Sequence, residues 1–332
     1  MSELLEKRIE ELRADYTKTY GQPFSHFYCP VLFRDEDATL CKAHIVNQAF
    51  ANSSRAWTIQ RKDVDGFYGS NFESDFVDIQ NFATKSHFEI LTDKNLSRKF
   101  NSKILVDDKP VDFFFANQEL PDNFTELRFE DINISVPFGL KMHPAEVVAS
   151  QEKHWEVEIS RDIRIPMLVS IIKAAHLTLF AIHGYNYALS SSGMFIGQQI
   201  LGEFFLKNHK KPKPKVVKEA HGFFREYKHM VRPLISGNFE GSITDRTFLL
   251  CMGSSGFPWA MMTFIKTSNI VHAALIPVLD HPDRAVTYLD FMRNENEIIQ
   301  VATCRFEEDH WAIEKGTRIM NWPKSGILYP EE

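Results

Sequence analysis

Residues 27–46 read FYCPVLFRDEDATLCKAHIV and are the most informative stretch in the N-terminal part of the chain. Its two ends are rich in residues that favour β-strands, and the polar run RDED separates them. The pattern predicts a β-hairpin with strands at 27–33 and 39–46. A polar loop follows, and then a helix within 64–84. Ser70-Asn71-Phe72-Glu73 has the spacing of a capping box, which would start the well-formed part of that helix at Ser70.

The rest of the chain mixes helical and strand patterns. A helix at 2–20 is predicted because Leu5, Ile9, Leu12 and Tyr16 fall on one face. The other predicted elements are strands within 86–138, a helix from Pro166 to Gly184, a helix at 192–206, and strands of a mixed or antiparallel sheet within 244–329. The expected class is therefore α+β, with one domain at 1–140 and a helical and β-sheet domain at 141–332.

Composition narrows the classes of protein that the chain can belong to. With 332 residues it exceeds the usual size of one domain, and its net charge of −6 excludes a protein coated in basic charge. Four scattered cysteines are too few for a disulfide scaffold. The N-terminus lacks the apolar run of a secretory signal, and Lys173 interrupts the longest apolar stretch. We therefore expect a cytoplasmic protein without a membrane span.

The hairpin, loop and helix carry a resemblance to a known family. A strand ending in Ala43-His44-Ile45, followed by a loop and a helix, resembles the ββα-metal finger of HNH endonucleases. The resemblance implies that His44 is the general base that activates water. It also implies a divalent cation such as Mg²⁺, with Asp65 in VDGFYG as one ligand and Glu73, about two helical turns later, as another.

The chain departs from the family pattern at several positions. Many members carry an acid before the base, where this chain has Ala43. The zinc-bearing branch uses two Cys-x-x-Cys pairs. Here Cys29 remains, whereas Leu32, Arg61 and Val64 stand where the other cysteines would be, so structural zinc is not expected and apolar packing must hold the finger together.

Each of these residues also has a purely structural interpretation. His44 could be a strand histidine with one hydrogen bond, and Asp65 a solvated residue at a helix start. Glu73 could be the capping-box partner of Ser70. Cys29, Cys41 and His44 could together bind zinc, but no fourth ligand is evident, and buried free cysteines are the other interpretation.

A basic segment lies in the second half of the chain. Residues 207–232 hold nine Lys or Arg and two Glu, a net charge of +7. We interpret the Pro-spaced part at 207–218 as a linker or ordered loop. It is either a solvated surface or a site for nucleic-acid phosphates. The lysines expected to contact phosphate are Lys207, Lys210, Lys211, Lys213, Lys215 and Lys218.

Three hypotheses of function follow. The first is a divergent HNH-like, metal-dependent nuclease that hydrolyses phosphodiester bonds in nucleic acid, with DNA as the expected substrate. The family often serves in bacterial defence against foreign DNA. The second is a non-catalytic HNH-derived protein that binds nucleic acid, a protein partner or a second copy of itself. The third is an unrelated small-molecule enzyme with a site near Gly253 to Pro258.

Overall fold

A computed structural model gives the structure of the chain. It describes residues 3–50, 56–77, 80, 102–106, 109–112, 124–129, 132–135, 164–224, 230–235, 247–252, 257–267, 270–280, 283, 286, 298–307 and 310–321. The chain divides into two units. One joins Met1–Val77 to Asp162–Glu332, and the other is Asp78–Arg161. This division differs from the expected boundary at residues 140/141, because segments from both halves of the sequence build the first unit.

The first helix follows its sequence pattern. Helix α1 spans Glu3–Tyr20 and buries Ile9, Leu12 and Tyr16. Gly21 ends the helix in the left-handed region, with φ 90°, and its N–H donates to the Thr17 carbonyl at 2.8 Å. Glycine favours this position because a Cβ would strain it. The predicted helix and its buried face are thus confirmed.

The expected strand at 27–33 is wrong. Strand β1, Leu40–His44, pairs antiparallel with β2, Trp57–Arg61, which lies further along the chain. Residues 29–33 instead form a turn, in which the Phe33 N–H donates to the Cys29 carbonyl at 2.8 Å. Residues 29–32 are all buried, whereas a strand alternates its side chains between two faces. Pro30 also lacks the N–H that a central strand position needs.

An acidic helix follows β2 directly. Helix α2 spans Lys62–Tyr68, the π-helix η1 continues through Gly69–Glu73, and helical conformation persists over 74–77. We call residues 62–77 the acidic helix. Ser70 lies inside it and accepts a hydrogen bond from Ser74 Oγ at 3.2 Å, so the expected capping box is wrong. The helix begins at Lys62 because β2 runs straight into it without a loop.

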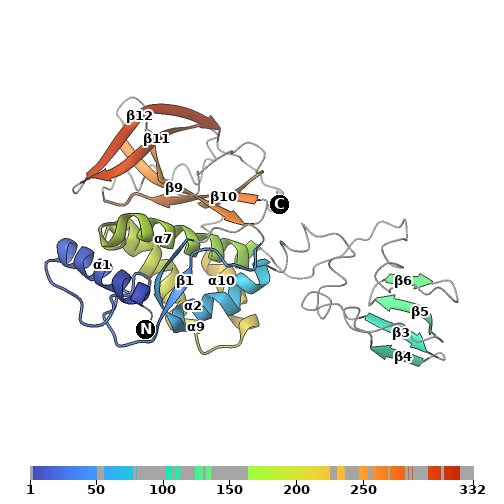
Figure 1. The fold of residues 1–332 in the computed structure, drawn as a ribbon. Helices are drawn as coiled ribbons and strands as arrows, with labels where there is room; N and C mark the ends of the chain where they lie inside the picture. The colour runs from blue at the N-terminus through green and yellow to red at the C-terminus, as the bar shows by residue number, and fades with distance from the viewer. Residues whose placement is uncertain are drawn as a thin grey trace. The chain divides into compact units, whose positions relative to one another are not determined.

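Helix α7, Arg164–Ala188, is the central element of the first unit. It contacts α1, β2 and η1 as well as strands β7, β9 and β10. Figure 1 shows it between the N-terminal elements and the C-terminal sheet. The stretch Ile165–Ala188 is long and apolar enough to cross a bilayer, but 89% of its 18-residue apolar window is buried inside the protein. At Gly184, φ is 59° and the helical conformation is interrupted, close to the predicted end.

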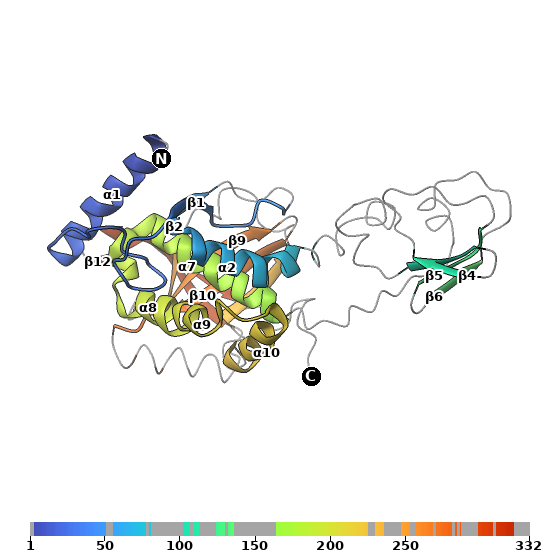
Figure 2. The ribbon, with the colours of Figure 1, turned by 90° about the horizontal axis from the view of Figure 1, so that it is seen from below.

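A second helical run packs beside α7. It consists of α8, Ser191–Met194, the π-helix η2, Phe195–Gly202, and α9, Glu203–Asn208. After residues 209–212 the chain forms α10, Lys213–Phe224, which Figure 2 shows next to α9. The interpretation of 207–218 as a loop or linker is therefore wrong over most of its length. Pro214 lies in the first turn of α10, where proline is compatible with a helix.

The strands form antiparallel sheets. The six-stranded sheet of the first unit has the order β12-β11-β8-β9-β10-β7, and every neighbouring pair is antiparallel, so the sheet is not mixed. Its strands are β7 Val231–Ile235, β8 Thr247–Met252, β9 Phe257–Thr267, β10 Ile270–Pro277, β11 Ile298–Glu307 and β12 His310–Asn321.

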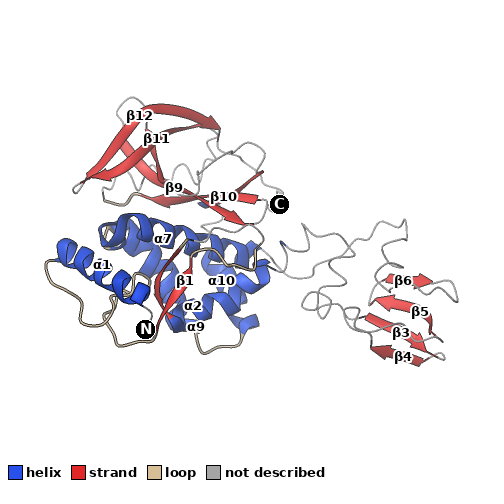
Figure 3. Cartoon of the chain, in the orientation of Figure 1, coloured by secondary structure: helices blue, strands red, loops and turns tan. Residues whose placement is uncertain are grey.

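The second unit contains a separate antiparallel sheet. Its order is β4-β3-β5-β6, and its strands are β3 Ser102–Val106, β4 Lys109–Asp112, β5 Phe124–Phe129 and β6 Ile132–Ser135. Figure 3 shows the helices and strands of both units. The predicted α+β class is confirmed.

Candidate functional site

A fully buried lysine lies between the two carboxylates that the sequence singles out as metal ligands. Lys173 on α7 has 0% exposure. Its Nζ atom lies 3.0 Å from Asp65 Oδ1 and 2.7 Å from Glu73 Oε1. The side chain of Asp65 is 33% exposed and that of Glu73 is 11% exposed. We call Lys173, Asp65 and Glu73 the lysine–carboxylate triad.

The π-helical turn of the acidic helix brings the two carboxylates onto one face. Glu73 follows Asp65 by eight positions, whereas two turns of an α-helix take about 7.2 residues. In an ideal α-helix Glu73 would therefore point somewhat away from Asp65. The segment Gly69–Glu73 is π-helical, and its i→i+5 hydrogen bonds take more residues per turn. The wider π-helical turn accommodates the part of this spacing that exceeds two α-helical turns. Asp65 and Glu73 therefore lie on one face, where the Lys173 ammonium group contacts both.

The surroundings keep Lys173 charged. Burial by itself lowers the pKa of Lys173, but Glu73 and Asp65 outweigh burial and raise that pKa above its usual value. Asn47 Nδ2 donates to the second oxygen of Glu73 at 3.3 Å, and the Tyr68 ring lies 5.8 Å from the ammonium nitrogen. A charge buried this deeply is tolerated only when partners compensate it. The triad is therefore an internal ionic crosslink between α7 and the acidic helix.

One face of the β1–β2 pair lies toward this triad. Burial and the nearby Asp65 carboxylate raise the pKa of Cys41 to about 11, while Lys173 opposes the shift. The Cys41 thiol therefore stays protonated at neutral pH. In an antiparallel pair, directly opposed residues share a face, so Gln60 lies on the same face as Cys41. The Gln60 amide is fully buried, and neither of its polar atoms has a hydrogen-bond partner among the described residues.

His44 lies on the opposite face of strand β1. Successive strand residues alternate between faces, so His44 shares a face with Lys42 and not with Cys41. Lys42 Nζ lies 4.8 Å from the ring of Trp57, the cross-strand partner of His44, which identifies this second face. His44 is half-buried. The structure thus joins Asp65 and Glu73 through Lys173 and places His44 on the other side of the strand.

The triad leaves no place for a divalent cation between its acids. Such an ion would take the position of the Lys173 ammonium group, and two cations at that distance repel each other. In the part of the chain that the structure describes, no three His, Cys, Asp or Glu side chains are grouped to hold a metal ion. As arranged, Asp65 and Glu73 do not fit the Mg²⁺ site that the HNH resemblance implies.

At the four positions that correspond to zinc cysteines, three residues are buried in the core and the fourth forms ion pairs. Cys29, Leu32 and Val64 are 0%, 4% and 0% exposed. Burial raises the pKa of Cys29 to about 11, although the backbone N–H groups of Leu32 and Val31 donate to its sulfur. The fourth residue, Arg61, forms ion pairs at 2.7 Å with Glu36 and 2.8 Å with Asp63. Apolar contacts and ion pairs hold these turns together.

A buried histidine ties α7 to the same turn. His176 Nε2 donates to the Pro30 carbonyl at 3.0 Å, and its Nδ1 accepts from the Tyr187 hydroxyl at 2.9 Å. Burial lowers the pKa of His176 to about 4, so the ring is neutral near pH 7. His176 is therefore a hydrogen-bonded histidine of the core.

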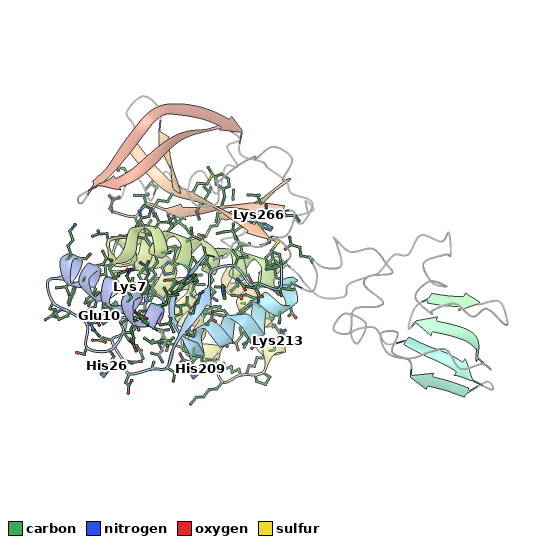
Figure 4. The ribbon with its side chains drawn as sticks, in the orientation of Figure 1. Lys7, Glu10, His26, His209, Lys213 and Lys266 are labelled. Atoms are coloured by element: carbon green, nitrogen blue, oxygen red, sulfur yellow. The ribbon has the colours of Figure 1, made fainter. Side chains whose placement is uncertain are left out.

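The six lysines expected to bind phosphate fall into two groups. Three have carboxylate partners: Lys207 pairs with Glu203, Lys211 with Glu219 at 3.4 Å, and Lys213 with Asp75 at 2.7 Å. Three others are exposed and form no ion pair with the described residues: Lys210, Lys215 and Lys218. Figure 4 shows Lys213 and His209 on the side of the molecule formed by α9 and α10.

Sequence reasoning missed the function of Lys173. Its signal was present, because a lysine in the middle of an otherwise apolar helix must find a buried partner or leave the core. The partners themselves lie 108 and 100 positions away in the sequence. Only the folded chain could identify them as Asp65 and Glu73.

Comparisons of the chain with protein-family models, with curated proteins and with solved structures found no match. The HNH resemblance therefore depends on the residues quoted above and on the geometry of the elements that carry them.

Proposed function

We propose that the chain is a non-catalytic derivative of the HNH ββα finger that binds nucleic acid. The observation that carries this proposal is the position of Lys173. Its ammonium group contacts both acids that would hold the metal ion, at 3.0 and 2.7 Å. The finger would serve as a scaffold, and the basic elements after it would make the contacts with phosphate.

The order of elements supports descent from such a finger. Strand β1 carries Ala43 and His44 and ends there, β2 pairs with it, and the acidic helix follows immediately. The turn that starts at Cys29 directs two backbone N–H groups at the cysteine sulfur. Loss of zinc would favour replacement of the remaining cysteines by packed apolar residues, which agrees with buried Leu32 and Val64.

The charge of the triad supports binding without cleavage. Phosphodiester hydrolysis places new negative charge on phosphate, which a metal ion can stabilise. Here the two acids are already neutralised in part by Lys173, and their charge serves the stability of the core. His44 lies on the other face of β1, so activation of water by His44 would not be assisted by the triad.

A nuclease is the second candidate, and two observations favour it. His44 is half-buried and so retains some access to solvent, and the Asp65 side chain is one-third exposed. In that case His44 would act as general base at a phosphate bound on the outer face of the β1–β2 pair.

One experiment separates the two candidates. Purified protein is incubated with supercoiled plasmid in Mg²⁺, Mn²⁺ or EDTA, and binding to labelled DNA is measured by fluorescence anisotropy. We expect binding without nicking in every condition, and unchanged binding for His44→Ala. Divalent-dependent nicking that His44→Ala abolishes would select the nuclease. An affinity that does not change between 50 and 200 mM salt would contradict phosphate binding altogether.

A further inference from the structure

The basic elements after α9 form a fixed surface. Lys213 Nζ contacts Asp75 at 2.7 Å and Ser74 at 3.0 Å, which ties the start of α10 to the acidic helix. Val216 and Ala220 on α10 are both 0% exposed. Lysines on a helix that is anchored in this way keep a defined spacing. A phosphate-binding site built from them would lose little backbone conformational entropy on binding.

Only part of the basic charge on this surface is available to a ligand. Lys207, Lys211 and Lys213 are engaged with carboxylates of the chain itself. Lys210, in the turn after α9, and Lys215 and Lys218, on α10, are exposed and have no such partner among the described residues. We call Lys210, Lys215 and Lys218 the open lysines. Their charge is the part that can neutralise phosphate without first breaking an ion pair.

The aromatic residues near the open lysines do not favour single-stranded nucleic acid. Proteins that bind single strands stack bases on accessible aromatic rings. Phe204 and Phe205 are each 3% exposed, and the exposed His209 ring is already stacked on Phe205, with ring centroids 4.8 Å apart. Among the side chains that the structure describes, this surface therefore offers charge and not stacking, which suits the regular phosphate backbone of a duplex.

The shape of α10 favours DNA over RNA. An α-helix with its side chains is about 10–12 Å across, and the major groove of B-form DNA is about 12 Å wide. The major groove of A-form RNA is deep and too narrow for side chains to read. Helix α10 spans twelve residues and carries two of the open lysines at positions i and i+3, on one face.

We propose that the open lysines Lys210, Lys215 and Lys218 bind the phosphate backbone of duplex DNA, with α10 lying along the major groove. This inference rests on the proposed nucleic-acid-binding function and assigns its surface and its partner. Three phosphate contacts give a slope of about −2.7 in a plot of log affinity against log salt concentration. The affinity then falls about 40-fold between 50 and 200 mM salt.

The test uses the full chain and three labelled ligands of one sequence: a 20-base-pair DNA duplex, its single strand, and the RNA duplex. We expect the DNA duplex to bind best. The variant Lys210→Gln/Lys215→Gln/Lys218→Gln should lose at least about tenfold in affinity at 100 mM salt, and each single substitution should reduce the salt slope by about 0.9.

The matched control removes the same charge elsewhere. Lys7, Lys18 and Lys62 are exposed, and Lys7 lies on α1, away from Lys213 in Figure 4. The variant Lys7→Gln/Lys18→Gln/Lys62→Gln should bind duplex DNA like the parent protein. Thermal melts of both triple variants establish that they are folded.

Three results would overturn the assignment, and they can be told apart. If the parent protein binds none of the ligands, the proposed nucleic-acid-binding function fails as well. If it binds DNA but the open-lysine variant binds equally well, only the surface is wrong. If the single strand or the RNA duplex binds more tightly than the DNA duplex, the partner is wrong.

Discussion

Lys173 on α7 and Lys215 on α10 carry the same ammonium group in opposite surroundings. Lys173 has 0% exposure and contacts two carboxylates from a helix about a hundred residues earlier in the sequence. Lys215 is exposed and forms no ion pair with the described residues. The charge of Lys173 is confined to the interior, where it can only hold elements together, whereas the charge of Lys215 is accessible to a ligand.

This comparison separates two uses of basic charge that composition cannot distinguish. Removing water from an ion makes each partner of that ion important, because the local dielectric is low and an unmatched charge is costly. At the surface, water and salt screen the same charge, so its loss has little effect on folding. Changes to the buried lysine, to a buried histidine, to a partly covered lysine and to the metal ions in solution test this difference, and we expect their effects to decrease in this order.

The largest effect should come from removing the buried ammonium group. Lys173→Met leaves Asp65 and Glu73 close together without a compensating charge, so we expect a loss of about 3–5 kcal/mol in the free energy of unfolding. Urea denaturation at pH 7 measures this loss. The triple variant Asp65→Asn/Glu73→Gln/Lys173→Met should recover most of it. A Lys173→Met protein as stable as its parent would show that the triad is not an important ionic crosslink.

The second largest effect should come from acid, which lowers the free energy of unfolding by protonating His176 in the unfolded chain. The pKa of His176 is about 4 in the folded protein and about 6.5 in the unfolded chain. Between these values the unfolded chain binds more protons, so stability is complete above pH 6.5 and falls as the pH decreases toward 4. The shift corresponds to about 3 kcal/mol for this residue.

Urea denaturation at pH 7 and pH 4.5 checks the contribution of His176. Burial also lowers the pKa of His183, to about 4, and that of His272, to about 3. The pH dependence of the parent protein's stability therefore contains contributions from all three histidines. The contribution of His176 is the difference between the parent and His176→Gln, whose stability should depend less on pH. An equal pH dependence in both proteins would contradict the assignment.

A smaller effect is expected where a lysine is only partly covered. Lys213 pairs with Asp75, but its side chain is 35% exposed. Lys213→Met should therefore reduce the free energy of unfolding by about 1 kcal/mol or less. The control is Lys207→Met, whose ion pair with Glu203 is mostly exposed and whose effect should be near zero. A loss for Lys213→Met as large as that for Lys173→Met would remove the distinction between buried and surface lysines.

The smallest effect concerns metal ions. Because an ammonium group lies between Asp65 and Glu73, neither EDTA nor 5 mM Mg²⁺ should change the midpoint of thermal unfolding by more than about 1 °C. Differential scanning fluorimetry measures this directly. A clear increase with Mg²⁺ or Mn²⁺ that disappears in Lys173→Arg or in Asp65→Asn would indicate a metal site at the triad and would favour the nuclease.

Local sequence signals predicted much of the helical structure. The apolar spacing of Ile9, Leu12 and Tyr16 predicted both α1 and its buried face, and Pro166 marked the beginning of α7 within two residues. These predictions succeed because helix formation and amphipathic burial depend on residues a few positions apart. The same reasoning placed Asp65 and Glu73 on one helix, although the π-helical turn that aligns them has no signal that we could identify.

Strand pairing was predicted less well. Residues 27–33 have strand-forming side chains but form a buried turn, whereas residues 57–61 form β2 although they follow a polar loop. Thr58 and Gln60 are buried polar residues on that strand, so its burial does not follow an alternating apolar pattern. Both strands contact α2, and β2 also contacts α1 and α7, so the pairing depends on tertiary contacts that no local pattern describes.

Local sequence patterns were enough to establish the α+β class, the main helices, and His44, Asp65 and Glu73 as residues with the chemistry of a site. They also showed that one lysine interrupts an apolar helix. Three features became visible only in the folded chain: this lysine contacts both acids, His44 lies on the other face of its strand, and the open lysines have no carboxylate partner among the described residues. The physical reason is that electrostatic energy depends on distance and burial, and both are properties of the folded chain.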